Sequence, residues 1–371
     1  MIELSGKYSS CKVFTNNISS AAIGQLIAVM NQEITSGSTI RVMPDVCTGK
    51  GSVVGLTMTI TDKVIPNIVS GDIGCGVLCV KLKESRVDLP KFDSIIREYV
   101  PSGASVHKES KENKTSAVVE DLRCYKYLAA KENYIYRSVG TLGGGNHFIS
   151  LERDSEDTYM LIHSGSRYLG TLVCEYYQKQ AYAQCEKKIP FELAHCSGDL
   201  FDDYVHDMKI VQKFAADNRA EMARVIMKYA KLHEVERFDT IHNYIDFDRM
   251  VVRKGSVSAS DGERLIIPLN MRDGSLICAG KGNPDWNFSA PHGAGRSMSR
   301  SDARQSIGMT EFKESMKGIY STSVTKSTID ESPMAYKPME DIIENIGDTV
   351  EIISHIEPIY NFKASGKDVD S

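Results

Sequence analysis

The chain has 371 residues, of which 42% are hydrophobic and 25% are charged, a composition typical of a folded globular protein rather than a disordered chain or a coiled coil. Its formal net charge of −5 gives no overall attraction to nucleic acid, so an RNA-binding surface would have to be locally basic. Nine cysteines without framework spacing indicate a reducing compartment, and the lack of a signal-peptide pattern or a long apolar run predicts a cytoplasmic protein with no membrane span.

The first forty residues predict a short strand followed by a helix. The strand is expected at 11–14 and the helix from about Ser19 to Gln32, with Ser19 or Ser20 as its N-cap. Apolar residues at helical spacing predict a stripe packed on the core, formed by Ile23, Leu26, Ile27 and Met30.

Residues 41–83 have the pattern of strands separated by turns. Strands are expected at 53–60 and 63–69, and Pro66 restricts the second to a sheet edge. The Gly-Lys-Gly sequence at 49–51 could hold a phosphate, but it lacks the spacing of a Walker loop, which favours a structural turn. The charged run at 108–114 predicts a solvated helix or loop.

A glycine-rich turn at residues 71–76 carries Asp72 and Cys75. The glycines allow a close backbone approach, so a carboxylate and a thiolate three residues apart could share one metal ion. The alternative is a simple turn at a strand end, in which Cys75 is a small buried hydrophobic residue.

Four of the nine histidines lie in similarly glycine-rich or turn-like settings. A lone histidine is more often a core residue than a ligand, but the recurrence of the setting favours a metal site. Imidazole, thiolate and carboxylate ligands together suit manganese, zinc or iron better than magnesium or calcium. The four residues are His147, His163, His242 and His292.

The rest of the chain combines helices with further strands. Strands are expected at 159–162, 241–245, 265–268 and 275–279, and 170–233 is expected to be largely helical. The tail after Lys363 is polar and is expected to fray. One long helix has a stripe that we interpret as core, formed by Val211, Phe214, Asn218, Met222, Val225, Tyr229 and Leu232.

Arg296, Arg300 and Arg304 follow His292 at four-residue intervals. A helix that begins near Gly295 would place the three arginines on one face beside the histidine, and such a helix N-terminus is an anion site suited to phosphate. The alternative is a solvated basic helix face, which would not explain the flanking His-Gly-Ala-Gly sequence.

These segments together resemble the RtcB family of RNA-splicing and RNA-repair ligases over nearly the whole chain. The resemblance implies an α+β fold with a single catalytic domain over residues 1–371, in which helices flank mixed β-sheets and a dinuclear metal site lies at strand ends. The matching motifs are Met-Pro-Asp-Val with Gly-Lys-Gly at 43–51, Asp-Ile-Gly-Cys-Gly at 72–76, Gly-Asn-His-Phe at 145–148, His-Ser-Gly-Ser-Arg at 163–167, Asn-Arg at 218–219, His-Asn-Tyr at 242–244, Arg-Lys-Gly at 253–255, His-Gly-Ala-Gly-Arg with Met-Ser-Arg at 292–300, and Ala-Tyr-Lys at 335–337.

The resemblance also implies an activity, which is the joining of RNA 3′-phosphate or 2′,3′-cyclic phosphate ends to 5′-hydroxyl ends with GTP and manganese, in RNA repair or tRNA splicing. It implies that His292 takes GMP from GTP, that GMP then passes to the RNA 3′-phosphate, and that the 5′-hydroxyl attacks the resulting diphosphate linkage. An archease-like activator is a possible partner, and a monomer is the expected state.

The family's site residues carry over by resemblance. Cys75 would bridge two manganese ions, with Asp72 and His147 completing one site and His163 and His242 completing the other. Contacts to GTP or GMP are implied for Asn146, Asn270, Ser275, Tyr336 and Lys363. Contacts to RNA phosphates are implied for Arg167, Arg296 and Arg300.

Two other functions stay open at this point. A metal-dependent 2′,3′-cyclic phosphodiesterase would keep the five metal ligands without a productive guanosine pocket, and it is supported by Ser150 and Asn270, which differ from the residues usual in the family. A non-enzymatic subunit that binds RNA ends would use the metal for structure, but such a site does not require His292 beside three arginines. GTP dependence separates the first two functions, and metal-dependent turnover separates both from the third.

Overall fold

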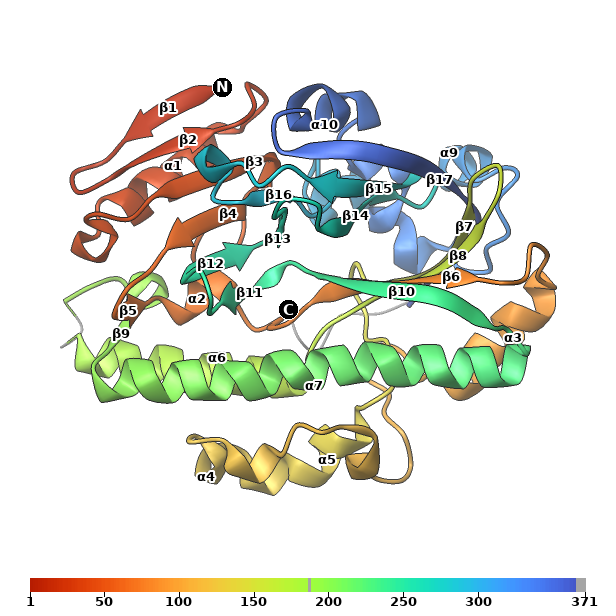
Figure 1. Ribbon diagram of the computed structural model, residues 1–371, viewed down its shortest axis with the longest axis horizontal. Helices are drawn as coiled ribbons and strands as arrows, with labels where there is room; N and C mark the ends of the chain where they lie inside the picture. Colours follow the sequence, from red (N-terminus) through yellow and green to blue (C-terminus); the bar gives the residue numbers. More distant parts are fainter. Residues whose placement is uncertain (186–187, 365–371) are drawn as a thin grey trace.

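The computed structural model describes residues 1–185 and 188–364 (Figure 1). The tail that the sequence predicts to fray lies, from residue 365 onward, outside the described residues. Two β-sheets lie above a layer of two long helices, and shorter helices flank this arrangement (Figure 1). The α+β fold class implied by the sequence is therefore confirmed, whereas the single-domain boundary at 1–371 stays a prediction.

A six-stranded sheet contains most of the N-terminal strands. Its strands are antiparallel except for one parallel pair, β2 with β3. Two strands from the middle of the chain complete it beside β4, so the N-terminal motifs come to lie next to residues 243–254. The strand order is β1 (Ile2–Ser5), β2 (Ser10–Val13), β3 (Ile40–Cys47), β4 (Val54–Thr59), β12 (Val251–Lys254) and β11 (Asn243–Asp246).

A seven-stranded antiparallel sheet forms the rest of the β structure. Its strand order is β10 (Glu234–Ile241), β6 (Gly76–Leu82), β8 (Thr158–Ser164), β7 (Phe148–Arg153), β17 (Val350–Lys363), β15 (Gly274–Gly280) and β14 (Arg264–Asn270). Gly76 pairs with both Ser164 and Ile241, and Phe148 pairs with His163. Because these pairs lie at one end of the sheet, the residues just beyond it come together there. Two short pairs, β13 (Ser256–Ser258) with β16 (Ser289–Pro291) and β5 (Lys63–Val64) with β9 (Cys196–Ser197), complete the strands.

The helices cover the sheets. The long helices α6 and α7 pack against each other; α7 contacts β6 and β8 of the larger sheet, and α6 contacts α2 and β9. Helices α4 and α5 lie below α7 in the view of Figure 1. The helices are α1 (Ser20–Met30), α2 (Pro66–Val69), α3 (Leu89–Tyr99), α4 (Tyr125–Leu128), α5 (Glu132–Arg137), α6 (Arg167–Gln184), α7 (Asp199–Ala230), α8 (Arg300–Ser306), α9 (Met309–Ser315) and α10 (Met339–Ile346). Among the described residues, no helix combines the length and the apolar character needed to cross a membrane.

The predicted N-terminal helix is present as α1, and Ser19 is its N-cap, because its hydroxyl accepts a hydrogen bond from the N–H of Ala22. The prediction that Ile27 belongs to the buried stripe was wrong. Ile27 is exposed, and Val29 is buried in its place together with Leu26.

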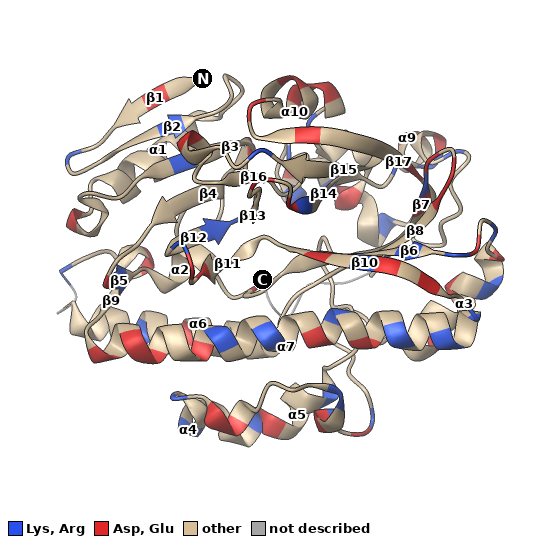
Figure 2. Cartoon of the chain, viewed as in Figure 1, with Lys and Arg blue, Asp and Glu red and all other residues tan. Residues whose placement is uncertain are grey.

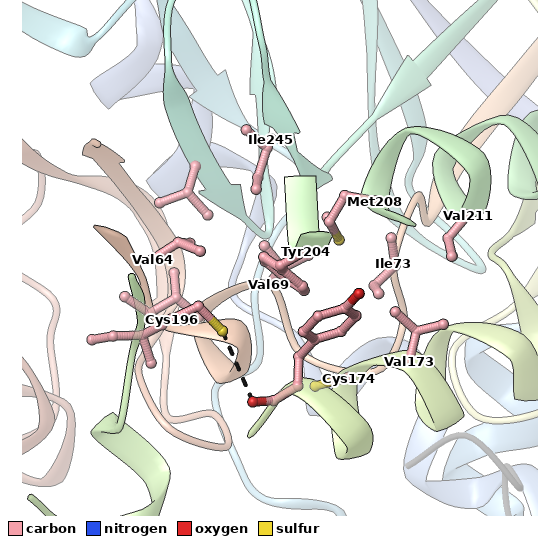
Figure 3. Packing of buried hydrophobic residues seen from close by; sticks show 14 of the residues in the cluster. Val64, Val69, Ile73, Val173, Cys174, Cys196, Tyr204, Met208, Val211 and Ile245 are labelled. Carbon is pink, nitrogen blue, oxygen red and sulfur yellow. Dashed lines mark hydrogen bonds between the residues drawn. The ribbon is translucent and has the colours of Figure 1, made fainter. Parts of the chain in front are cut away.

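The expected strand at 63–69 was wrong beyond its first two residues. Only β5 is a strand, and the chain then turns into α2, in which Pro66 occupies the first helical position. Proline suits that position because its missing N–H would have no partner there in any case. The segment is nevertheless buried, and Figure 3 shows Val69 and Ile73 packed near Tyr204 and Met208 of α7.

Helix α7 begins earlier in the chain than the sequence pattern indicates, and its buried face differs from the predicted one toward the C-terminal end. Val211 and Met222 are buried as predicted, but the stripe continues through Ile226. Val225 is half-buried and Tyr229 is exposed. Charges of both signs alternate along the exposed side of α7 (Figure 2), which agrees with the absence of a strong net charge.

Candidate functional site

Cys75 lies at the centre of a buried cluster at one end of the seven-stranded sheet. Its Sγ is 3.4 Å from His147 Nε2 and 3.2 Å from His163 Nε2. These three residues are all buried, and their ligand atoms lie within 4.8 Å of one another, so they could hold a metal ion. Thiolate and imidazole donors suit a transition metal.

The other two predicted ligands adjoin this cluster. Asp72 Oδ2 is 3.3 Å from His147 Nε2, and His242 Nε2 is 3.3 Å from His163 Nε2. Asp72 Oδ1 is buried and has no hydrogen-bond partner among the described residues, as expected of an oxygen that serves a cation. The structure thus brings all five predicted ligands together, and the donor set fits a divalent metal. Their division between two ions stays a prediction.

His242 reaches the cluster through a break in the chain's regular structure. The sequence predicts one strand over 241–245, but β10 ends at Ile241 and β11 begins at Asn243 in the other sheet. At the break, the His242 N–H donates a hydrogen bond to the carbonyl of Cys75. The change of sheet therefore fixes the imidazole beside the thiol.

Electrostatics keep the ligands in the forms that metals bind. Burial lowers the pKa of His163 and His242, and the neighbouring imidazoles lower it further, so both rings are neutral near pH 7. Burial opposes the ionised form of Asp72, but His147, Cys75 and Arg167 together outweigh burial and lower the pKa of that carboxyl. A neutral imidazole and an ionised carboxyl both offer lone pairs.

Two glycines make the close packing of the site possible. A Cβ at Gly165 would lie 2.1 Å from Asp72 Oδ1, so no larger residue fits there. Gly143 has φ +85°, and a Cβ on it would lie 2.0 Å from the Arg167 guanidinium. Arg167 is buried and its Nη1 is 3.3 Å from His147 Nδ1, so it lies behind a ligand and its assigned contact with RNA stays a prediction.

Asn218 and Arg219 of α7 tie the site loops together. The Asn218 Oδ1 accepts hydrogen bonds from the N–H groups of Gly140 and Thr141, and its Nδ2 donates to the Gly165 carbonyl. Arg219 Nη1 donates to the carbonyls of Gly74 and Ser164, both at 2.7 Å. The sequence places Asn218 in a core stripe and in a motif shared with the family, but it assigns the residue no role in the site. A fully buried amide within an apolar stripe was the available signal.

His292 follows β16 and lies beside the candidate metal ligands, with its ring centroid 4.8 Å from that of His242. Its Nδ1 is 2.5 Å from Oδ2 of the buried Asp45, which also accepts the His292 backbone N–H. This contact places the ring proton on Nδ1 and leaves the lone pair of Nε2 available for attack. Asp45 was part of a motif but not among the predicted site residues, because its distance from His292 in sequence gives no sign of contact.

A cavity of about 240 Å³ is lined by His292 and by His163 of the candidate metal ligands. Lys363 lines it, with Nζ 2.7 Å from Glu331 Oε2 and 3.4 Å from the Asn146 carbonyl. The side chain of Asn270 forms a hydrogen bond within its own turn, where Nδ2 donates to Asp273 Oδ2. The cavity is lined by every residue predicted to contact the nucleotide and by the predicted nucleophile, namely Asn146, Asn270, Ser275, Tyr336, Lys363 and His292.

The predicted arginine helix was wrong in its starting point. Gly295 has φ +72° and packs against the Asp45 carbonyl, so the helix α8 begins only at Arg300, capped by Ser299. Arg296 therefore lies in the preceding loop, although it lines the same cavity as Arg300.

The arginines face carboxylates rather than solvent alone. Asp330 and Glu331, at the end of the 3₁₀ helix Lys326–Glu331, accept hydrogen bonds from Arg296 and Arg300, and Asp330 Oδ2 also accepts one from Arg304 at 3.1 Å. With Lys363 included, cations outnumber carboxylates in this group. The excess positive charge suits an anion, and the RNA contacts assigned to Arg296 and Arg300 stay predictions.

Glu152 is a cavity residue that the sequence analysis missed. Its side chain is buried in β7, and burial raises the pKa of its carboxyl to about 7. It follows Ser150 by two residues, so both side chains lie on the same face of the strand. An acidic residue two positions after a polar one, in an otherwise apolar strand, was the available signal.

The sequence also matches known proteins over most of its length. The family model described as tRNA-splicing ligase RtcB matches residues 25–134 and 123–364. The RNA-splicing ligase RtcB1 of Escherichia coli strain ATCC 25922 is 32% identical over 358 residues, which cover 85% of this chain and 87% of the relative. The RNA-splicing ligase RtcB of Escherichia coli K12 is 31% identical over the same shares. The tRNA-splicing ligase RtcB of Aeropyrum pernix is 27% identical over 82% of this chain and 83% of the relative.

Proposed function

The chain belongs to the RtcB family and is an RNA ligase that forms phosphodiester bonds, and from this premise we propose that it joins RNA 3′-phosphate or 2′,3′-cyclic phosphate ends to 5′-hydroxyl ends with GTP and manganese. The reaction would proceed through a guanylylated His292. RNA repair and tRNA splicing are the settings that fit this chemistry.

The observation that carries the proposal is the position of His292 between a buried donor cluster and a cavity with excess positive charge. Its Nδ1 is held by Asp45, so Nε2 can act as a nucleophile toward a phosphate in the cavity. Lys363, Arg296 and Arg300 line the same cavity and would bind the anionic ligand. A metal used only for structure would not need such a neighbour.

In the first step, His292 Nε2 attacks the α-phosphorus of GTP. An N–P bond forms, the bond from that phosphorus to the oxygen bridging the β-phosphate breaks, and pyrophosphate leaves. The ring keeps its proton on Nδ1 and gains positive charge, which the Asp45 carboxylate balances. Manganese, when held by Cys75, Asp72 and the three histidines, would supply positive charge to the triphosphate and the leaving group.

The later steps return His292 to its starting form. An oxygen of the RNA 3′-phosphate attacks the same phosphorus, the N–P bond breaks, and its electron pair returns to Nε2. The 5′-hydroxyl oxygen then attacks the RNA phosphorus, GMP leaves, and the hydroxyl proton passes to water. A cyclic end first consumes one water molecule to give the 3′-phosphate. Because these steps depend on positioning and charge, the buried hydrogen bonds of Asn218 and Arg219 would support each of them.

The proposal is tested by incubating the manganese-loaded protein with GTP labelled at the α-phosphate and measuring the covalent label after denaturation. The wild type should take up acid-labile label, and His292→Ala should take up none. His233→Ala is a matched control, because His233 is exposed and pairs with Glu84 outside the site. If the wild type takes label from neither GTP nor ATP, the guanylylation mechanism fails and the cyclic phosphodiesterase becomes the better proposal. An archease-like activator and a monomeric state stay predictions.

A further inference from the structure

One wall of the cavity beside His292 is formed by alternate residues of two paired strands. Phe148 and Glu152 of β7 line the cavity, while Ile149 and Leu151 between them pack into a separate core cluster with residues of α3 and α7. In β17, Asn361 also lines the cavity and pairs directly with Ser150. The pleat of the sheet therefore directs Ser150, Glu152 and Asn361 to the same side.

Two polar atoms on this wall lack hydrogen-bond partners among the described residues, although both are buried. They are Glu152 Oε2 and Asn361 Oδ1, whose side chains belong to residues that are 2% and 3% exposed. The other oxygen of Glu152 accepts a hydrogen bond from Ser150 Oγ at 2.7 Å. Ser275 Oγ lies close enough to the Glu152 carboxylate to lower its pKa, yet it makes no well-formed hydrogen bond.

A carboxylate that served only the fold would normally use both oxygens, since an unpaired buried acceptor is costly. Here Ser150 holds one oxygen and leaves the other to the cavity. No cation is among the groups that affect the Glu152 carboxyl within the described chain, and burial raises its pKa to about 7. Hydrogen-bond donors brought by a ligand in the cavity would satisfy both atoms.

We propose that Glu152, with Asn361 beside it, reads the donor edge of a guanine base. This inference rests on the proposed function, which places GTP in the cavity. Guanine presents two adjacent donors, its N1–H and its 2-amino group, and two acceptors face them here. Adenine presents an acceptor at N1, which a carboxylate repels. The aromatic rings of Phe148 and Tyr336 line the same cavity and offer faces on which a purine can stack.

The proposal makes Glu152 a determinant of nucleotide choice rather than of the phosphoryl-transfer step. Glutamine at this position would present one donor and one acceptor, which matches the N1 and 6-amino groups of adenine. A Glu152→Gln change should therefore weaken guanine binding and improve adenine binding. A structural role alone would change the affinities for both bases to a similar extent.

The test is equilibrium dialysis of the full chain with GMP and with AMP near pH 8, where Glu152 is ionised. We expect the wild type to bind GMP at least tenfold more tightly than AMP, and Glu152→Gln to reduce this preference at least tenfold. Asn361→Ala should reduce it by a smaller factor. Glu221→Gln is a matched control, because Glu221 is a buried carboxylate that pairs with Arg224 on α7, and this variant should keep the wild-type preference.

An unchanged GMP preference in Glu152→Gln would overturn the proposal, as would a wild type that binds GMP and AMP equally or binds neither. The measurement needs no covalent label and no RNA. A wild type that prefers GMP but fails to label from GTP would therefore refute the guanylylation mechanism and leave the base-reading role of Glu152 supported. Labelling from GTP together with unchanged selectivity in Glu152→Gln would support the guanylylation mechanism and refute the base-reading role of Glu152.

Discussion

Asp45 and His292 are joined by two hydrogen bonds through a single carboxylate oxygen, which is 2.5 Å from the ring Nδ1 and 3.1 Å from the backbone nitrogen of His292. The first residue lies in β3 of the N-terminal sheet, and the second follows β16, nearly 250 residues later. The pair therefore fixes both the position of the loop and the orientation of the imidazole. Its other oxygen, Oδ1, is buried without a partner among the described residues.

Asp45→Asn should slow self-guanylylation about a hundredfold, because the amide keeps the shape of the carboxylate but cannot balance the positive charge that develops on the His292 ring. The rate of label uptake from α-labelled GTP measures this effect. Asp93→Asn is the control, since Asp93 is also buried and hydrogen-bonded but lies on α3, where it accepts from Tyr360 and Thr322. Equal rates in Asp45→Asn and the wild type would remove Asp45 from the mechanism.

Asn218→Ala should lower the free energy of unfolding by about 3 kcal/mol or more, because it leaves several buried donors and acceptors of two site loops without partners. The affected groups include the Gly140 and Thr141 N–H groups and the Gly165 carbonyl. Urea denaturation followed by circular dichroism measures the change. Ala223→Gly, on the same helix but without such bonds, should cost only about 1 kcal/mol. A cost for Asn218→Ala no larger than that of Ala223→Gly would show that the loops are held by other contacts.

The sequence predicted the residues of the candidate metal site because their chemistry is visible locally. Cys75, His147 and His163 each lie within two residues of a glycine, and residues that bind a common ion need such turns in order to approach one another. The order of strands that brings them together, with β8 between β6 and β7, could not be read from the chain, since antiparallel pairing depends on long-range contacts.

What the sequence could not predict is which polar residues become partners across long separations. Arg296 and Arg300 were expected on one helix face, but Arg296 lies in a loop and Arg300 is the first residue of α8. Both donate hydrogen bonds to Asp330 or Glu331, which lie thirty or more residues later in the chain. Glu152 gave only a weak signal, because its importance depends on burial and on the pairing of β7 with β17. Periodicity identifies faces of elements, whereas the partners of a buried charge depend on tertiary packing.

Cys75→Ala should abolish tight binding of manganese or zinc and reduce self-guanylylation by at least about a hundredfold, because the thiolate is the donor nearest to two of the histidines. Metal content after dialysis, measured by mass spectrometry, reports on binding independently of activity. Cys174→Ala serves as the control, since Cys174 of α6 is buried in a hydrophobic cluster (Figure 3). Retention of stoichiometric metal by Cys75→Ala would show that Cys75 is a core residue, the alternative that the sequence left open.

Glu152 should make the stability of the protein depend on pH in a defined direction. Burial raises the pKa of its carboxyl from the ordinary 4.5 to about 7, so the folded state binds a proton more tightly than the unfolded state does. The carboxyl therefore costs no stability below about pH 4.5, and its penalty grows as the pH rises to about 7. Glu152→Gln cannot ionise and escapes this penalty. Since one pKa unit corresponds to about 1.4 kcal/mol, we expect the free energy of unfolding of the variant to rise by about 2 kcal/mol or more, relative to that of the wild type, between pH 5 and pH 8.

Urea denaturation midpoints at the two pH values measure this gain in stability, with Glu221→Gln compared in the same way. A stability difference between Glu152→Gln and the wild type that is the same at both pH values would mean that the Glu152 carboxylate is already compensated in the folded protein, and its free oxygen would then no longer require a ligand.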